Sequence, residues 1–181
     1  MARLLTRWTV ADYHHMIASG LLAGRQVELV DGQITDRAPE LPIHRTTYRR
    51  GVKYLEALLG EQAVVFSAVP ITLPADGEPQ PDISVVRSPE SRYDQRHPGP
   101  GDIYWLIEVA NSSLVYDLGD KAQIYARDQI QDYWVIDIPN RQLWIHREPK
   151  HGKYQSIEPL TSGVITPLQG PKVEIQVERL L

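Results

Sequence analysis

The sequence has no cysteine among its 181 residues. This absence excludes disulfide bonds, thiolate metal sites and cysteine nucleophiles, and it fits a cytoplasmic protein. No apolar run approaches the roughly 20 residues that a membrane-spanning helix needs. Residues 1–8 also lack the long apolar core and the small-residue cleavage site of a secretory signal. We therefore expect a cytoplasmic protein without cysteine-based chemistry.

A strong basic excess is also missing, because the formal net charge is −4. This value counts mildly against a high-affinity, non-specific DNA-binding protein, but an enzyme could still meet nucleic acid through a local basic patch. Hydrophobic residues make up 42% of the chain and charged residues 23%, as in ordinary globular proteins. With no internal repeat and no linker, residues 1–181 are expected to form one domain.

The N-terminal third predicts a helix, a hairpin and a second helix. Thr9 is a candidate N-cap for a helix that runs to about residue 19. Residues 25–34 read as two short strands around Asp31-Gly32, a strong hairpin signal. The second helix spans residues 43–59, carries an apolar stripe and ends at Gly60.

The remainder predicts strands around one further helix at residues 113–128. Residues 88–102 are rich in proline, glycine and charge and predict a loop without regular structure. The order of elements indicates an α/β or α+β fold in which helices pack on a sheet. The expected strands lie at residues 63–73, 83–86, 103–110, 132–138, 141–147, 154–157 and 173–177.

Two carboxylates interrupt strand-like apolar sequence and say most about function. Asp82 precedes Ile-Ser-Val-Val, and Glu108 lies within Tyr-Trp-Leu-Ile-Glu-Val. Burying a carboxylate costs free energy unless a cation or a hydrogen-bond donor meets it. Side chains alternate along a strand, so Tyr104, Leu106, Glu108 and Ala110 are expected on one face. If the two strands are neighbours ~4.8 Å apart, Asp82 and Glu108 can bind one divalent ion.

The neighbouring residues suggest which metal and which cation would complete such a site. Oxygen ligands with no histidine or cysteine nearby favour Mg²⁺ or Mn²⁺ over zinc. The ion would lower the pKa of a bound water and neutralise charge on a phosphate, and Lys121 could stabilise that charge. Lys121 shares a helix face with Asp117 and Tyr125. The alternative is structural: arginines satisfy the strand carboxylates, and Asp117–Lys121 is a helical ion pair worth about 0.3–0.5 kcal/mol.

The motifs and their order over about residues 7–150 resemble the Uma family of predicted bacterial endonucleases, within the PD-(D/E)XK, restriction-endonuclease-like superfamily. The resemblance implies a mixed central sheet flanked by helices, Mg²⁺-dependent phosphodiester hydrolysis, and Asp82 and Glu108 as metal ligands. The matching motifs are Val27-Glu28-Leu29-Val30-Asp31-Gly32-Gln33-Ile34, His44, Pro81-Asp82, Ile107-Glu108-Val109, Tyr116-Asp117-Leu118-Gly119-Asp120-Lys121, Tyr125 and Asp132-Tyr133-Trp134-Val135-Ile136-Asp137.

One departure from the superfamily pattern concerns the lysine. The superfamily places it two residues after the glutamate, where this chain has Ala110. Lys121, on the next helix, resembles the relocated lysine of the Uma family. A serine-proline pair often follows the glutamate in that family, whereas this chain has Ala110-Asn111-Ser112.

Other candidates carry weaker signals. Glu28 is either a further site carboxylate, as the resemblance suggests, or a solvent-facing hairpin residue. His44 could bind a phosphate or cap its helix, and Tyr125 could donate to the site or pack in the core. The cations Arg45, Arg49 and Lys53 follow one line of the helix at residues 43–59. They form either a solvated charged face or a face that tracks nucleic-acid phosphates.

We therefore predict a metal-dependent endonuclease that acts on nucleic acid, DNA rather than RNA, with Mg²⁺ or Mn²⁺ as cofactor. The alternative is an inactive nuclease fold that binds nucleic acid or protein. A metal-free hydrolase with two carboxylates is a third hypothesis. Because many such nucleases address two strands as dimers, a homodimer is also expected.

Overall fold

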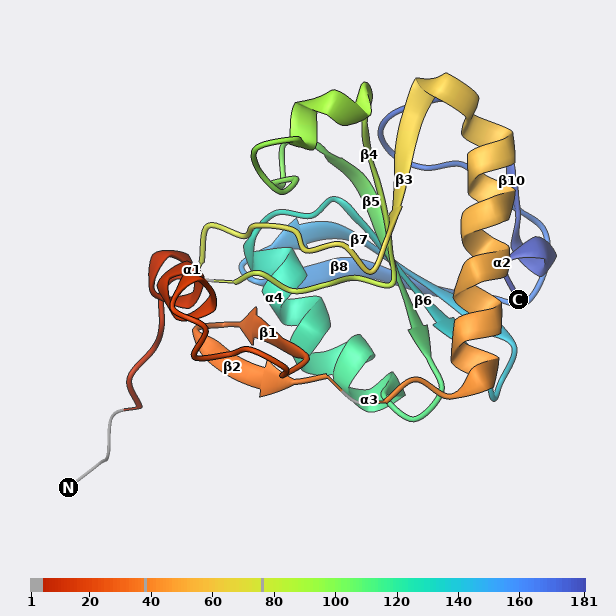
Figure 1. Ribbon diagram of the computed structural model, residues 1–181. Helices are drawn as coiled ribbons and strands as arrows, with labels where there is room; N and C mark the ends of the chain where they lie inside the picture. The colour runs from red at the N-terminus through yellow and green to blue at the C-terminus, as the bar shows by residue number, and fades with distance from the viewer. Residues whose placement is uncertain (1–4, 38, 76) are drawn as a thin grey trace.

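The computed structural model describes residues 5–37, 39–75 and 77–181. Its centre is a six-stranded sheet with the order β3-β4-β5-β6-β7-β8, and helices cover both faces (Figure 1). Within this sheet β5 and β6 pair in parallel, and the other neighbouring strands pair antiparallel. The prediction of a mixed sheet flanked by helices, with an N-terminal helix and hairpin, is confirmed. None of the described helices is long and apolar enough to cross a membrane.

The described elements alternate between helices and strands in the N-terminal two thirds and are mostly strands thereafter. The helical segments are α1 (Val10–Ala18), α2 (Pro42–Leu59), η1 (Gly60–Gln62), η2 (Glu90–Tyr93), α3 (Leu114–Tyr116), η3 (Asp117–Lys121), α4 (Ala122–Arg127) and η4 (Val177–Arg179). The strands are β1 (Val27–Val30), β2 (Gln33–Asp36), β3 (Ala63–Ser67), β4 (Ile83–Arg87), β5 (Ile103–Ala110), β6 (Asp132–Asp137), β7 (Gln142–Lys150), β8 (Lys153–Leu160), β9 (Val164–Ile165) and β10 (Ile175–Gln176).

One face of the sheet packs against α2 and the C-terminal segment. Leu55 and Leu59 of α2 are buried against β-strand residues such as Trp105 and Trp134, whose rings stack 5.7 Å apart between centroids. Aromatic and aliphatic burial of this kind is the main source of folding free energy. α2 spans this face as the long helix at the right of Figure 1.

The opposite face packs against α4 and is richer in tyrosine. Tyr125 from α4 and Tyr133 from β6 are fully buried there, with ring centroids 4.9 Å apart. A buried tyrosine normally needs a partner for its hydroxyl group, so this face must also supply acceptors. The acceptors lie at the candidate site described below.

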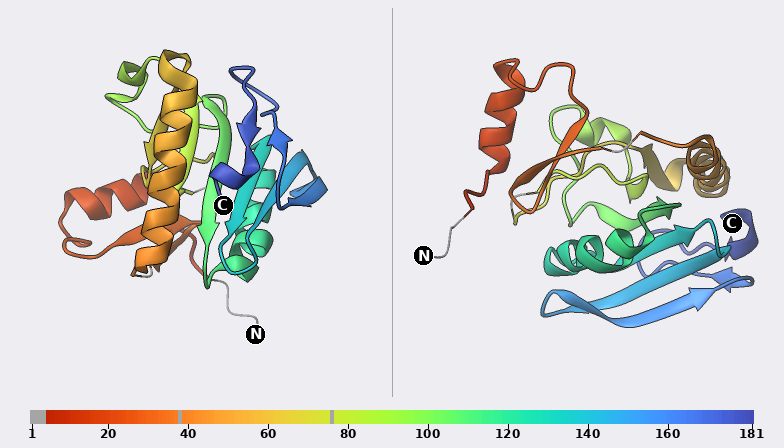
Figure 2. Two further views of the ribbon diagram at one scale, coloured as in Figure 1. Left: turned by 90° about the vertical axis from the view of Figure 1, so that its right-hand side faces the viewer. Right: turned by 90° about the horizontal axis from the view of Figure 1, so that it is seen from below.

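The N-terminal helix and hairpin attach to the body through polar contacts and a small core of their own. Thr9 caps α1 as predicted, in a reciprocal capping box with Asp12. Leu29 of β1 bridges Glu78, and Asp31 accepts hydrogen bonds from Arg127 of α4. These contacts hold β1 and β2 beside the sheet (Figure 2).

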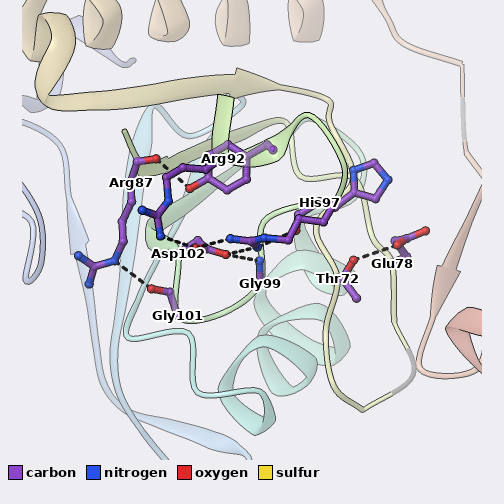
Figure 3. A network of polar contacts seen from close by, with 10 residues as sticks. Thr72, Glu78, Arg87, Arg92, His97, Gly99, Gly101 and Asp102 are labelled. Carbon is purple, nitrogen blue, oxygen red and sulfur yellow. Dashed lines mark hydrogen bonds and ion pairs between the residues drawn. The ribbon is translucent and has the colours of Figure 1, made fainter. Parts of the chain in front are cut away.

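Two expectations about the segments beside β4 were wrong. The strand expected at residues 63–73 ends at Ser67, because Ala68 takes a positive φ of 51° that turns the chain. The loop at 88–102 contains η2 and is fixed around Asp102 (Figure 3). The Asp102 carboxylate accepts from Arg96 at 3.0 Å and from the Gly99 N–H at 3.0 Å. Hydrogen bonds to the Asp102 side chain therefore fix most of this segment in place of helix or strand hydrogen bonds.

The predicted alternation along β5 fails at one residue. Val85 of β4 pairs with Trp105 and Val86 pairs with Ile103, so Tyr104 is an extra residue in a β-bulge. Tyr104 packs with the α2-side core, whereas Leu106 and Ala110 pack with the α4-side core. The regular alternation holds from Leu106 onward, which includes Glu108.

Candidate functional site

The two strand carboxylates lie at the same level of neighbouring antiparallel strands. Asp82 immediately precedes Ile83, whose register partner is Ile107 of β5, so Asp82 lies level with Glu108. The Asp82 carboxylate accepts a 2.7 Å hydrogen bond from the backbone N–H of Val109. Asp82 and Glu108 are both buried, with exposed fractions of 6% and 3%. The sheet therefore fixes both carboxylates at one point.

A cavity of about 370 Å³ opens over these two residues. Six carboxylates line it: Asp82, Glu108, Glu28 from β1, Asp36 from β2, Glu40 and Asp117 from η3. Asp82, Glu108, Glu28 and Asp117 each use one oxygen for protein hydrogen bonds, and their other oxygens accept none from the residues that the structure describes. None of these second oxygens is among the buried, unpartnered atoms. The cavity is therefore lined by oxygen acceptors that remain available to a ligand.

Lys121 supplies the buried cation of this cavity. Its Nζ lies 2.8 Å from Glu108 Oε1, and its side chain is 9% exposed. Asp117 instead accepts a 2.6 Å hydrogen bond from the Ser113 hydroxyl. The structural alternative, an ordinary Asp117–Lys121 pair, does not describe these contacts. The helix at 113–128 delivers the lysine to the strand carboxylate.

That helix is not the single α-helix expected from the sequence. It is divided into α3, a π-helical segment from Asp117 to Lys121, and α4. A π turn holds one extra residue and occurs often at functional sites, since it redirects the side chains that it contains. Here both ends of the π segment, Asp117 and Lys121, line the cavity.

Two further side chains hold the carboxylates in place. The Tyr125 hydroxyl donates a 2.8 Å hydrogen bond to Glu108 Oε1. His44 Nε2 lies 3.1 Å from Asp82 Oδ2. The expectation that no histidine lies near the two carboxylates was therefore wrong. So was the suggestion that His44 caps its helix, because the N-cap of α2 is Leu41.

Burial and mutual repulsion set the electrostatics of the site. Burial, together with the charges of Asp82 and Asp117, raises the pKa of Glu108 to about 8 against the opposing effect of Lys121. Burial also raises the pKa of Asp117. Burial disfavours the charged form of Lys121, but the surrounding carboxylates outweigh it and raise its pKa. The hydrogen bond to Asp82 raises the pKa of His44. The site therefore holds more carboxylates than its cations balance.

The donor set fits a hard divalent cation. Within the described residues, no three His, Asp or Glu side chains are grouped closely enough to hold a metal ion by themselves. Mg²⁺ is commonly bound by one or two carboxylates, with waters and substrate phosphates as its remaining ligands. Asp82 and Glu108, each with a second oxygen free of protein donors, match that pattern.

The structure separates the predicted site residues into two groups. Asp82, Glu108, Lys121, Glu28, His44 and Asp117 line the cavity, and Tyr125 contacts Glu108 from below it. Arg45, Arg49 and Lys53 line a different groove along α2. Glu28 is not a purely solvent-facing residue, because it accepts a hydrogen bond from the Gln80 N–H at 3.0 Å.

Sequence reasoning missed other residues that line the cavity, among them Ser113, Arg37 and the carboxylates Asp36 and Glu40. Ser113 stands four residues before Asp117, a helical spacing that could have indicated their hydrogen bond. Arg37 bonds the Gln80 side chain at 2.8 Å, and nothing in the local sequence indicates that contact.

Residues 10–178 match the model of the Uma2 family, described as "Putative restriction endonuclease". The chain belongs to the Uma2 family. Among solved structures, the Uma2 chain is similar to a "putative nuclease belonging to DUF820" from Anabaena variabilis, with a TM-score of 0.61. The two share 17% sequence identity, and the alignment covers 85% of this chain and 88% of that one. No curated protein matches it.

The family and the fold together are those of a nuclease, with nucleic acid as the class of substrate. Nucleases of the restriction-endonuclease type generally use divalent metal ions, and the acceptor-lined cavity of this Uma2 chain is compatible with one.

Proposed function

We propose that this Uma2 chain is an endonuclease that hydrolyses nucleic-acid phosphodiester bonds with Mg²⁺ or Mn²⁺. The supporting observation is the cavity over Asp82 and Glu108. Each of these carboxylates keeps one oxygen free of protein donors, and Lys121 lies 2.8 Å from Glu108. DNA is the proposed substrate because the family is described as restriction endonucleases.

In this proposal Asp82 and Glu108 hold the metal. The ion, when bound, would lower the pKa of a water nucleophile and neutralise charge on the phosphate. The backbone N–H of Val109 and His44 orient Asp82, and Tyr125 orients Glu108. Lys121, which is buried beside Glu108, stabilises the negative charge that develops on the phosphate.

Glu28 and Asp117 are two further carboxylates of this proposed site, beside Asp36 and Glu40. They raise the negative potential of the cavity and so favour a cation there. The N-terminal end of α2 also borders the cavity, because its N-cap Leu41 and His44 of its first turn line it. A helix N-terminus carries partial positive charge and favours a phosphate group.

The test is cleavage of supercoiled plasmid DNA with Mg²⁺ or Mn²⁺, with RNA as a second substrate. Asp82→Asn and Glu108→Gln should each reduce cleavage by about 10³-fold, since a metal ion supplies several kcal/mol of transition-state stabilisation. Asp128→Asn is the matched control. Asp128 is buried outside the cavity, and its hydrogen bond from the Ala75 N–H can persist in the variant.

The alternative of an inactive binding module is favoured by one observation, the alanine at position 110 in place of the superfamily lysine. Lys121→Met separates the two proposals. A nuclease should lose turnover yet still bind Mn²⁺ in calorimetry, whereas a binding module has no turnover to lose. If the unmodified protein binds neither ion and cleaves neither DNA nor RNA, the nuclease proposal fails. The predicted homodimer is tested separately by sedimentation.

A further inference from the structure

A second concave surface, separate from the carboxylate cavity, has the opposite charge. It is a groove of about 870 Å³ beside α2. Glu178 is the one carboxylate residue of its described lining, and that side chain accepts a hydrogen bond from the Gly163 N–H. The cations that line the groove are Arg45, Arg49, Arg50, Lys53, Arg141 and Arg179.

The groove is assembled from three segments that are far apart in the sequence. The first four cations come from α2, Arg141 comes from the turn between β6 and β7, and Arg179 comes from η4. Tyr54 of α2 anchors the C-terminal segment. Its hydroxyl accepts from the Gln176 N–H at 2.9 Å, and the Arg179 guanidinium lies 4.2 Å from its ring centroid. The tertiary structure therefore brings these cations together, and the cluster does not arise from the sequence of α2 alone.

These six side chains are all exposed, and none forms an ion pair within the part of the chain that the structure describes. By contrast, Arg7, Arg96, Arg127 and Arg147 each pair with an aspartate. Gathering like charges without partners is unfavourable, and a bound polyanion would relieve that repulsion.

We infer that this groove binds the phosphate backbone of the same nucleic acid whose scissile phosphate enters the carboxylate cavity. The inference rests on the proposed nuclease function and adds a second contact region to it. Consecutive residues at the start of α2 line the two regions: His44 lines the cavity, and Arg45 lines the groove. In this inference, a strand that leaves the cavity passes around the start of α2 onto the cations.

The spacing and chemistry of the groove suit a nucleic-acid strand. Arg45, Arg49 and Lys53 follow one line of α2 and span about 12 Å at 1.5 Å per residue. This length corresponds to roughly three or four phosphates of a strand at 3.4 Å per step. Five of the six cations are arginines, whose planar guanidinium groups bind phosphate through two hydrogen bonds. A concave groove admits a strand, whereas a flat bilayer surface cannot enter it.

The experiment measures binding without catalysis. Fluorescence anisotropy of a labelled 20-base-pair DNA duplex is recorded in EDTA over a range of KCl concentrations, with the full chain. In the variant Arg49→Gln/Lys53→Gln/Arg141→Gln, affinity should fall at least tenfold at about 100 mM salt. The slope of log K against log salt should decrease by roughly 2 to 3, because each lost phosphate contact removes almost one unit.

The matched control compares two double variants that each remove two positive charges. Arg49→Gln/Lys53→Gln removes them inside the groove, and Lys150→Gln/Lys153→Gln removes them outside it. Lys150 and Lys153 are exposed at the hairpin between β7 and β8, away from the groove. If both double variants weaken binding equally, or if the triple variant binds as tightly as the unmodified chain, the inference is overturned. Salt-dependent binding to phosphatidylserine vesicles that competes with the duplex would also overturn it.

Failure of the groove and failure of the nuclease proposal are distinguishable. Asp82→Asn should bind the duplex in EDTA at least as tightly as the unmodified chain, because it removes a negative charge from the cavity, while its cleavage in Mn²⁺ falls by about 10³-fold. If the groove variant retains binding and the unmodified chain cleaves DNA, only the groove inference is lost. If the groove variant loses binding but no condition yields cleavage, the groove stands and the nuclease proposal fails.

Discussion

The two faces of the central sheet differ in what they bury, although the same strands form both: the α2 side buries mainly apolar side chains, and the α4 side also buries polar and charged groups. On the α2 side the centre is packed by aliphatic side chains and the stacked pair Trp105 and Trp134. On the α4 side, tyrosine hydroxyls and carboxylates are buried together, and Tyr133 donates to the backbone carbonyl of Asp117. Apolar burial stabilises a fold, whereas buried charge costs desolvation free energy. Apolar burial on the α2 side therefore offsets the desolvation cost of the polar site on the α4 side.

The largest effect is expected from the α2 side. Trp134→Ala removes a fully buried ring, its stacking on Trp105 and a hydrogen bond to Asp132. We expect the free energy of unfolding to fall by about 3–5 kcal/mol, because the cavity left behind collapses only in part. Urea denaturation followed by circular dichroism measures the loss. Ile157→Ala, at an exposed position of β8, should change it by less than about 0.5 kcal/mol.

On the α4 side, replacing both members of the buried pair Glu108 and Lys121 by apolar residues should not destabilise the fold, whereas replacing one member should. Lys121→Met leaves Glu108 without its cation and should cost about 3 kcal/mol, the low end for a broken buried pair, because Glu108 can take up a proton. The double variant Glu108→Leu/Lys121→Met should recover that loss or exceed the original stability. Denaturation of Lys121→Met, Glu108→Leu and the double variant, each compared with the unmodified chain, gives the coupling energy. A double variant no more stable than Lys121→Met would contradict this expectation, because the loss would then not come from the unpaired charge of Glu108.

The strands and helices of both faces could largely be predicted from the sequence because apolar periodicity reports burial directly. The N-terminal hairpin, α2, β5 and β6 all lie where their patterns place them. The bulge at Tyr104 could not be predicted, since nothing in an apolar run marks the extra residue. The π segment was missed for a similar reason: its register depends on what Asp117 and Lys121 contact, not on local propensity.

The candidate site was predictable in its residues but not in its contacts. Carboxylates within apolar, strand-like sequence are unusual, so Asp82 and Glu108 stood out from their local pattern, and the family resemblance implied that they are metal ligands. The contact between His44 and Asp82 joins positions 38 residues apart, and no spacing rule connects them. The predicted nucleic-acid-binding residues Arg45, Arg49 and Lys53 could be recognised in the sequence as a line of cations on α2. Arg141 and Arg179 join it only through tertiary packing.

The free energy of unfolding should also depend on pH through a histidine on the α4 side, His146. Burial lowers the pKa of His146, which lies between Tyr133 and Tyr154, to about 4. The unfolded chain, with an ordinary histidine pKa of 6.5, takes up the proton first as pH falls. The contribution of the neutral ring is therefore complete above pH 6.5 and is lost as pH falls toward 4, by about 3 kcal/mol in total.

His146→Leu should flatten this part of the stability profile. Urea denaturation at several pH values between 4 and 7 measures the slope. His151→Gln, at the exposed turn between β7 and β8, serves as the control and should keep the original slope. Equal slopes in His146→Leu and in the unmodified chain would mean that His146 is not the group that titrates.

The smallest effect tests how closely stability and proposed function are linked on the α4 side. Tyr125→Phe removes a 2.8 Å hydrogen bond to Glu108, and Tyr154→Phe removes one of 2.9 Å to the carbonyl of Ile130. Each should cost about 1 kcal/mol, the usual net value of a buried hydrogen bond. Only Tyr125→Phe should also change cleavage and Mn²⁺ affinity, because it frees the carboxylate proposed to hold the metal. If both variants affect cleavage equally, Tyr125 acts through packing, and the division between a stabilising face and a functional face does not extend to single hydroxyl groups.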